Sequence, residues 1–136
     1  MDKAEFRWPV RVYWEDTDAG GIVFYANYLK FFERARTEWL RSLGVEQHQL
    51  KQTTGGMFVV AETSVKYLRP ARLDDELIVT ASLQQMGRAS MTISQRVLLK
   101  NSVICSSMIR ISWVDAATLQ PDRIPQSILI NLKNIV

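Results

Sequence analysis

The sequence predicts an α+β domain in which a five-stranded antiparallel sheet wraps around one long helix. Residues 26–43 repeat their apolar side chains every three or four positions, as a helix does. This segment follows one extended segment and precedes four more, which are separated by short polar breaks. An order of strand, helix and then consecutive strands favours an antiparallel sheet over parallel βαβ units.

The first extended segment is expected at residues 6–15, FRWPVRVYWE. Val10, Val12 and Trp14 alternate with Arg11 and Tyr13, and this alternation indicates a strand. The sequence DTDAGG follows, and its aspartates and paired glycines predict a loop before the helix.

The helix is expected to be covered on more than one side. Gly44 provides a stop signal after its last apolar residue. Leu29, Phe31 and Leu40 widen the apolar stripe, which is why a curled sheet is the expected cover. The residues that form the stripe itself are Tyr28, Phe32, Ala35, Trp39 and Leu43.

Four further strands are expected at residues 57–68, 76–85, 90–99 and 103–114, with a short C-terminal helix at 125–134. In the first of these strands the odd positions from 57 to 67 are mostly apolar and are expected to cover the helix. Phe58 and Val60 are apolar on the other set of positions, and an apolar patch there needs a cover from elsewhere.

Composition limits the classes of function. The chain has 136 residues, a net charge of +3, one cysteine and one histidine. We expect a single cytoplasmic domain over residues 1–136, because no secretory signal, no bilayer-length apolar run and no disulfide pair is present. The charge excess is small for a nucleic-acid binder, a site with several histidine ligands is excluded, and neither a P-loop nor a dinucleotide fingerprint occurs.

The most informative polar cluster contains the carboxylates of Glu15, Asp16 and Asp18, just before Gly20 and Gly21 and the helix. A helix start offers free N–H groups to an oxyanion, and a carboxylate beside it can serve as a general base or nucleophile on an acyl group. The ordinary alternative is that Asp16 or Asp18 only closes a turn through its own side chain.

Other candidate residues have ordinary explanations. His48 lies in a polar stretch and is expected in solvent, and Cys105 lies in a strand and is expected to be a buried, inert thiol. Glu33 is expected to form a surface pair with Arg36. Three arginines near strand ends suit phosphate oxygens, although surface charge is the commoner explanation for any one of them: Arg69, Arg72 and Arg88.

Two segments carry a family resemblance. The run YWEDTDAGGIVFYANYL from Tyr13 to Leu29, continued by FERAR at 32–36, and the run YLRPARLDD at 67–75 resemble the 4-hydroxybenzoyl-CoA thioesterase-like hotdog family. Within it they are most similar to the YbgC-type acyl-CoA thioesterases that are encoded with the bacterial Tol-Pal system. The resemblance implies a hotdog fold, assembly into a homodimer or homotetramer with active sites between protomers, and no metal or organic cofactor.

The resemblance also implies roles for individual residues. Asp18 takes the position of the catalytic carboxylate, and the N–H of Tyr25 that of the donor to the thioester carbonyl. Many YbgC-type proteins have histidine where this chain has Tyr25, whereas the 4-hydroxybenzoyl-CoA thioesterase resembles this chain in having tyrosine. The expected substrate-binding residues are Gly21, Phe58, Val60, Arg88 and Ser90, with Phe58 and Val60 at a subunit contact or in the adjoining acyl pocket and Arg88 near the CoA phosphates.

The resulting expectation is an acyl-CoA thioesterase, in which Asp18 attacks the thioester or activates water. Two alternatives come from other classes. One is a hotdog dehydratase or isomerase acting on acyl thioesters, which the absence of histidine from the DTDAGG loop disfavours. The other is a non-catalytic or weakly catalytic partner of acyl carrier protein or of a lipid-synthesis enzyme, since YbgC-type proteins are associated with both.

Overall fold

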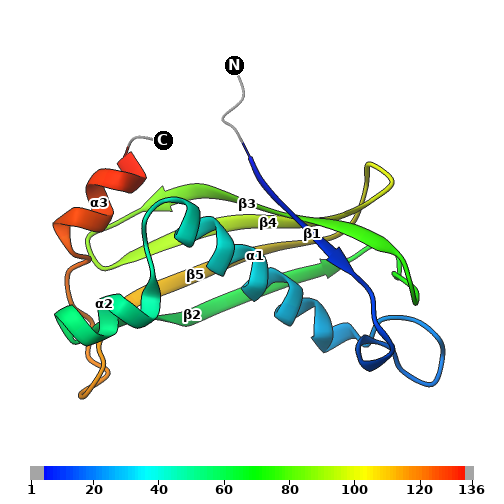
Figure 1. Ribbon diagram of the computed structural model, residues 1–136, viewed down its shortest axis with the longest axis horizontal. Coiled ribbons are helices and arrows are strands. Elements are labelled where there is room, and N and C mark those ends of the chain that lie inside the picture. Colours follow the sequence, from blue (N-terminus) through cyan, green and yellow to red (C-terminus); the bar gives the residue numbers. More distant parts are fainter. Residues whose placement is uncertain (1–4, 134–136) are drawn as a thin grey trace.

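A long helix lies across one face of a five-stranded antiparallel sheet in the computed structural model, which describes residues 5–133 (Figure 1). The helix, α1, spans Tyr28–Ser42, and the strand order in the sheet is β1-β3-β4-β5-β2. This arrangement confirms the predicted fold class. The strands are β1 (Phe6–Arg11), β2 (Gly56–Tyr67), β3 (Glu76–Met86), β4 (Ser90–Leu99) and β5 (Ser102–Asp115).

Shorter elements complete the chain. Two 3-10 turns, η1 (Trp14–Asp16) and η2 (Tyr25–Asn27), flank the loop that precedes α1. The helix α2 (Gln47–Thr54) leads into β2, and α3 (Gln126–Lys133) is the predicted C-terminal helix, whose expected last residue, 134, lies outside the described residues. Within residues 5–133, none of the helices combines the length and the apolar character that crossing a membrane requires.

The core lies between α1 and the sheet. The predicted stripe is buried from Tyr28 to Trp39, and Leu43 is half-buried. Leu29 departs from the expectation, because it is 43% exposed on the outer side of the helix. The residues that α1 contributes to the core cluster are Tyr28, Phe31, Phe32, Ala35, Trp39 and Leu40, and those of β3 are Leu77, Val79, Ala81 and Leu83.

The first strand is shorter than predicted. β1 ends at Arg11, and Trp14, which was expected within the strand, lies in η1 and is 79% exposed. Beyond Arg11 the backbone of Val12 bonds to the loop before β3, with its N–H donating to the carbonyl of Asp75. The chain then turns into η1, because the Asp16 carboxylate accepts the Tyr13 N–H, and this turn carries Trp14 away from the core.

The odd positions of β2 were expected to face the helix, and this prediction is wrong for the first half of the strand because the strand contains a β-bulge. Phe58 and Val60 pair with Trp113 and Ile111, which belong to the buried core. The register then shifts between Val60 and Glu62, so that Ala61 is the extra residue. One inserted residue exchanges the two faces of a strand. Even positions therefore face the helix before the bulge, and odd positions face it afterwards.

Candidate active site

The two segments that carry the family resemblance meet at one corner of the molecule, where α1 begins (Figure 1). Ile22 forms an isolated antiparallel bridge with Arg72. The Val23 N–H donates to the Ala71 carbonyl at 2.9 Å, and the Ala71 N–H donates to the Tyr28 hydroxyl at 3.0 Å. Residues almost fifty positions apart therefore form one structural unit.

The acidic loop is a small hairpin. Thr17 bridges to Val23, the Asp18 N–H donates to the Ile22 carbonyl at 2.9 Å, and the Gly21 N–H donates to the Asp18 carbonyl at 3.0 Å. Gly21 has a φ of +80°, a left-handed conformation that side chains with a Cβ rarely adopt. The predicted substrate-binding glycine is thus also the residue that lets the loop reverse.

The Asp16 carboxylate is buried and fully engaged. Its Oδ2 accepts the Tyr13 N–H at 2.8 Å, and its Oδ1 accepts the Asn27 side-chain amide, also at 2.8 Å. Asp16 is 3% exposed and Asn27 is 7% exposed. This carboxylate therefore connects η1 to η2, the turn that precedes α1. Such a turn-stabilising role is the alternative to catalysis that the sequence offered for Asp16.

The Asp18 carboxylate differs, because it is exposed at the tip of the loop. Its Oδ1 accepts the Gly20 N–H at 2.8 Å, so the turn-closing role considered for Asp18 is present too. Within residues 5–133 its Oδ2 accepts no hydrogen bond, and this oxygen is free to meet a ligand. A Cβ at Gly20 would lie 3.2 Å from Asp18 Oδ1, so a side chain there would crowd the carboxylate.

The start of the helix provides the second feature of this corner. Tyr25 opens η2, which runs directly into α1, and the first N–H groups of a helix have no acceptor inside it. The Tyr25 side chain is 64% exposed, and its carbonyl accepts the Tyr67 hydroxyl at 2.9 Å. The Tyr25 ring lies 4.9 Å from that of Phe24 and 6.2 Å from that of Tyr67.

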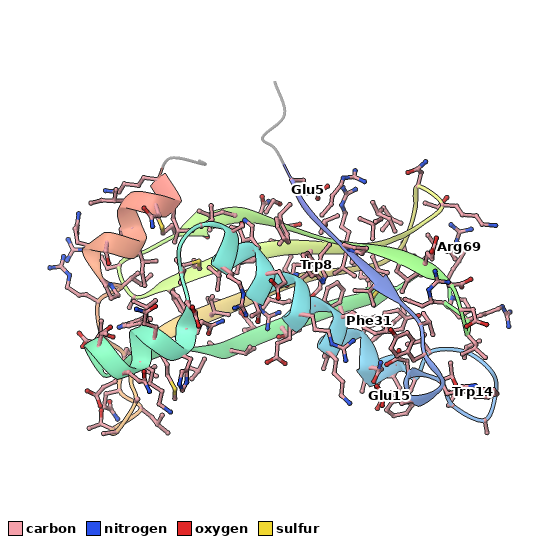
Figure 2. All side chains as sticks on the ribbon, in the orientation of Figure 1. Glu5, Trp8, Trp14, Glu15, Phe31 and Arg69 are labelled. Carbon is pink, nitrogen blue, oxygen red and sulfur yellow. The ribbon has the colours of Figure 1, made fainter. Side chains whose placement is uncertain are left out.

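Further side chains gather at this end of the molecule. Burial raises the pKa of the Tyr28 and Tyr67 phenols, so both are protonated at neutral pH. Trp14 and Glu15 are exposed here, and Arg69 also lies at this end (Figure 2). The corner therefore combines exposed aromatic rings with charged groups of both signs.

The structure does not bring all the predicted site residues together. Arg88 and Ser90 lie at the β3–β4 connection, at the opposite end of the molecule from the loop that carries Asp18 (Figure 1). There the carbonyl of Arg88 accepts the Ile124 N–H at 2.8 Å. Within one chain, Arg88 and Ser90 are therefore not brought together with the Asp18 loop.

Phe58 and Val60 line a separate small cavity of about 90 Å³ between α1 and β2. The Phe58 ring packs edge-on against Trp113, with ring centroids 5.0 Å apart, whereas Val60 is 53% exposed. Arg36 lines the same cavity, and sequence reasoning placed it at the surface. The available signal was its position: it follows Phe32 by four residues and precedes Trp39 by three, on the buried stripe.

His48 and Cys105 behave as their ordinary explanations predict, whereas the expected surface pair between Glu33 and Arg36 is not among the ion pairs of residues 5–133, because Arg36 is buried. His48 is exposed in α2. Cys105 is fully buried, and this burial raises the pKa of its thiol to about 12, so the reactive thiolate is scarce at neutral pH. In the part of the chain that the structure describes, no three His, Cys, Asp or Glu side chains are grouped as metal ligands would be.

Known proteins resemble this chain over nearly its whole length. A family model described as the thioesterase-like superfamily matches residues 12–132. A protein from Escherichia coli named "Acyl-CoA thioester hydrolase YbgC" is 40% identical over 134 residues, which cover 98% of this chain and 99% of the relative. A protein from Haemophilus influenzae named "Acyl-CoA thioesterase YbgC" is 38% identical, with 90% of each chain covered.

Solved structures agree with this fold. A probable thioesterase from Bartonella henselae superposes with a TM-score of 0.84 at 31% identity, covering 90% of this chain and 100% of that one. A Staphylococcus aureus protein solved in complex with CoA superposes with a TM-score of 0.91 at 17% identity, covering 99% and 85%. The second likeness concerns the fold alone.

Proposed function

This chain belongs to the thioesterase-like superfamily, and we propose that it hydrolyses acyl-CoA thioesters with Asp18 as its catalytic carboxylate. One observation carries the assignment of Asp18. Of the two aspartates in the loop, Asp16 is buried with both oxygens engaged, whereas Asp18 is exposed with one oxygen free beside the start of α1. A catalytic carboxylate must reach the substrate, and of these two aspartates Asp18 meets that requirement.

The chemistry has two possible courses from the same geometry. In one, Asp18 takes a proton from water while the water oxygen bonds to the acyl carbon. The carbon–sulfur bond then breaks, and the thiolate of CoA takes up the proton. In the other, the Asp18 carboxylate itself attacks the acyl carbon and expels the thiolate, and water then hydrolyses the resulting anhydride. Both yield the free acid and CoA.

The Tyr25 N–H is the proposed donor to the oxyanion that forms on the thioester oxygen in either course. It opens the helix and has no acceptor within it. Loss of one such donor typically costs about 2.7–4 kcal/mol of transition-state stabilisation. The tyrosine side chain has no part in this role, because the donor is the backbone.

The substrate-binding part of the proposal requires a second subunit. Gly21 shapes the loop beside the thioester, while Arg88 and Ser90 lie at the other end of the chain and would reach the CoA nucleotide only from a partner. Sites shared within a homodimer or homotetramer meet this requirement. Phe58 and Val60 would then line the acyl pocket from β2. We place this reaction in the cytoplasm. Acyl carrier protein is a further proposed partner, and the resemblance to YbgC-type proteins associates the chain with the Tol-Pal system.

The experiment that tests the proposal compares Asp18→Asn with the matched variant Glu15→Gln, in a panel of acyl-CoA substrates with detection of the released thiol. We expect Asp18→Asn to lower kcat at least about 100-fold. Glu15 is an exposed carboxylate three residues away and takes no part in the proposed reaction, so Glu15→Gln should retain wild-type turnover. Near-normal turnover by a folded Asp18→Asn variant would exclude Asp18. A wild-type protein that hydrolyses no member of the panel would favour the non-catalytic alternative.

A further inference from the structure

The phenol of Tyr67 bonds directly to the residue that carries the proposed oxyanion donor, although the proposed reaction does not use this side chain. Tyr67 is the last residue of β2, and its hydroxyl donates to the carbonyl of Tyr25 at 2.9 Å. The two residues are 42 positions apart in the sequence. This bond therefore connects an edge strand of the sheet to the turn that precedes α1 (Figure 1).

The Tyr67 hydroxyl is committed to this bond. A phenol has one hydrogen to donate, and in Tyr67 the Tyr25 carbonyl receives it. Partial burial raises the pKa of Tyr67, so the hydroxyl keeps this hydrogen at neutral pH. The ring is held by two edge-on aromatic contacts, with centroids 6.2 Å from the Tyr25 ring and 5.7 Å from the Tyr28 ring. The side chain is thus placed to support the backbone of Tyr25.

Two hydrogen bonds hold the two peptide groups on either side of the Tyr25 Cα. The Tyr25 N–H belongs to the peptide group whose carbonyl is that of Phe24, and this carbonyl accepts the Asn27 N–H at 2.8 Å. The Tyr25 carbonyl belongs to the next peptide group, which the Tyr67 hydroxyl holds. Because peptide groups are planar, only φ and ψ of Tyr25 lie between them. Holding both planes therefore fixes the direction in which the Tyr25 N–H points.

The side chains of this turn are too exposed to fix the backbone by packing. Phe24 is 46% exposed and Tyr25 is 64% exposed. Stabilisation of an oxyanion depends on donors that already point at the developing charge. A displacement of about 1 Å at a reacting centre can cost roughly 100-fold in rate. The bond from Tyr67 consequently matters more here than it would at a turn packed into the core.

The end of β2 is itself firmly attached to the sheet. Tyr67 pairs with Cys105 of β5, which is fully buried. The next two N–H groups, those of Leu68 and Arg69, donate to the carbonyl of Ile104 at 2.9 Å and 3.1 Å. The phenol therefore extends from a rigid part of the molecule to the exposed turn.

We propose that Tyr67 is a positioning residue, whose phenol holds the Tyr25 N–H in the orientation that receives the oxyanion. This inference rests on the proposed thioesterase function. The thioester oxygen gains its negative charge on the way to the transition state, so a misdirected N–H weakens binding of the transition state more than binding of the substrate. Loss of the phenol should therefore lower kcat and leave KM nearly unchanged.

The kinetic test compares Tyr67→Phe with Tyr13→Phe in acyl-CoA hydrolysis. We expect Tyr67→Phe to lower kcat about tenfold, which is less than the roughly 100- to 1,000-fold cost of losing a donor altogether. This variant keeps the ring and its contacts with Tyr25 and Tyr28, so the fold is retained. Tyr13→Phe is the matched control, because it removes an exposed phenol at the same end of the molecule and should keep the wild-type kcat.

Amide NMR of the ¹⁵N-labelled protein gives a second readout that needs no turnover. Tyr67→Phe should shift the amide signals of Tyr25 and of Ala26, whose N–H shares a peptide group with the bonded carbonyl. Tyr13→Phe should leave both signals in place. If Tyr67 only stabilised the fold, the shifts would instead spread along β2 and α1.

Three results would overturn the inference. One is a Tyr67→Phe variant with wild-type kcat, and another is a raised KM at constant kcat, which would place the phenol on the substrate. The third is a pair of Tyr25 and Ala26 amide signals that do not move. In each case the proposed reaction still stands if Asp18→Asn is inactive and the wild type is active. A wild type that hydrolyses no acyl-CoA refutes the proposed reaction itself, whatever Tyr67→Phe does to the amide signals.

Discussion

Replacing Asp16 by asparagine should destabilise the fold more than it disturbs the chemistry. The substitution keeps the size of the side chain and exchanges one carboxylate oxygen for an NH₂ group. Asp16 accepts one hydrogen bond on each oxygen, from the Tyr13 N–H and from the Asn27 amide. Whichever way the new amide turns, its NH₂ meets one of these two donors, so one hydrogen bond is lost and two donors face each other.

The magnitude follows from the burial of the site. Asp16 is 3% exposed and Asn27 is 7% exposed, so water cannot replace the missing partner. An unsatisfied buried donor costs about 1–3 kcal/mol, and the lost bond had an ionised acceptor. We therefore expect a loss of about 2 kcal/mol in the free energy of unfolding, which for a chain of this size lowers Tm by roughly 6–10 °C.

The assay pairs thermal unfolding, followed by circular dichroism, with acyl-CoA hydrolysis well below the transition. Asp18→Asn is the opposite case, because an exposed side chain away from the core changes stability by no more than about 0.5 kcal/mol. We expect Asp16→Asn to lose stability and retain more activity, and Asp18→Asn to lose activity at wild-type stability. If Asp16→Asn is as stable as the wild type and is the less active of the two, the roles assigned to these carboxylates are reversed.

Four further predictions concern single side chains. Tyr25→Phe should keep most of the activity, since the proposed donor is the backbone N–H; a loss as large as that of Asp18→Asn would implicate the phenol. Cys105 should resist alkylation at pH 8 and react only on unfolding. Burial raises the pKa of its thiol to about 12, so the reactive thiolate is scarce at pH 8. Rapid labelling of the folded protein would contradict this. Arg88→Ala should raise KM at nearly constant kcat, and an unchanged KM would return Arg88 to ordinary surface charge. Val60→Lys should shift an oligomeric wild type toward monomers in light scattering, because Val60 is exposed on β2 whereas its neighbour Phe58 packs on Trp113. A monomeric wild type that hydrolyses acyl-CoA would contradict the shared site.

The sequence predicted the elements well where local periodicity decides them. The strand at 90–99 has the bounds that were expected, and the stripe of α1 is buried from Tyr28 to Trp39. The family resemblance is confirmed as well. The carboxylate cluster was recognised, but the structural role of the buried Asp16 carboxylate was not singled out, because it depends on a bond to Asn27, eleven residues later.

What the sequence left out depends on partners far along the chain. The bulge after Val60 is set by pairing with β5, so an alternating pattern within β2 gave the wrong face for Phe58. Arg36 has the charge of a surface residue but a position on the buried stripe of α1, and its hydrogen-bond partner Gln95 lies 59 residues away, which local patterns do not reveal. Arg88 was expected near CoA because it is an arginine in a loop at a strand end, and this loop lies at the end of the molecule opposite Asp18.

The strand order also determines when this corner can form during synthesis on the ribosome. The N-terminus of the chain emerges first, and β1 can pair only after β3 has been synthesised. Arg11 of β1, for example, pairs with Glu76, which is 65 residues later in the chain. Until then the apolar side chains of Phe31 and Phe32 on α1 lack the sheet that covers them in the folded protein. The loop with Asp18 likewise lacks Ala71 and Arg72, against which it is held. A nascent chain released before residue 76 would expose an apolar helix without the sheet that covers it. Because of this topology, we expect such truncated chains to aggregate.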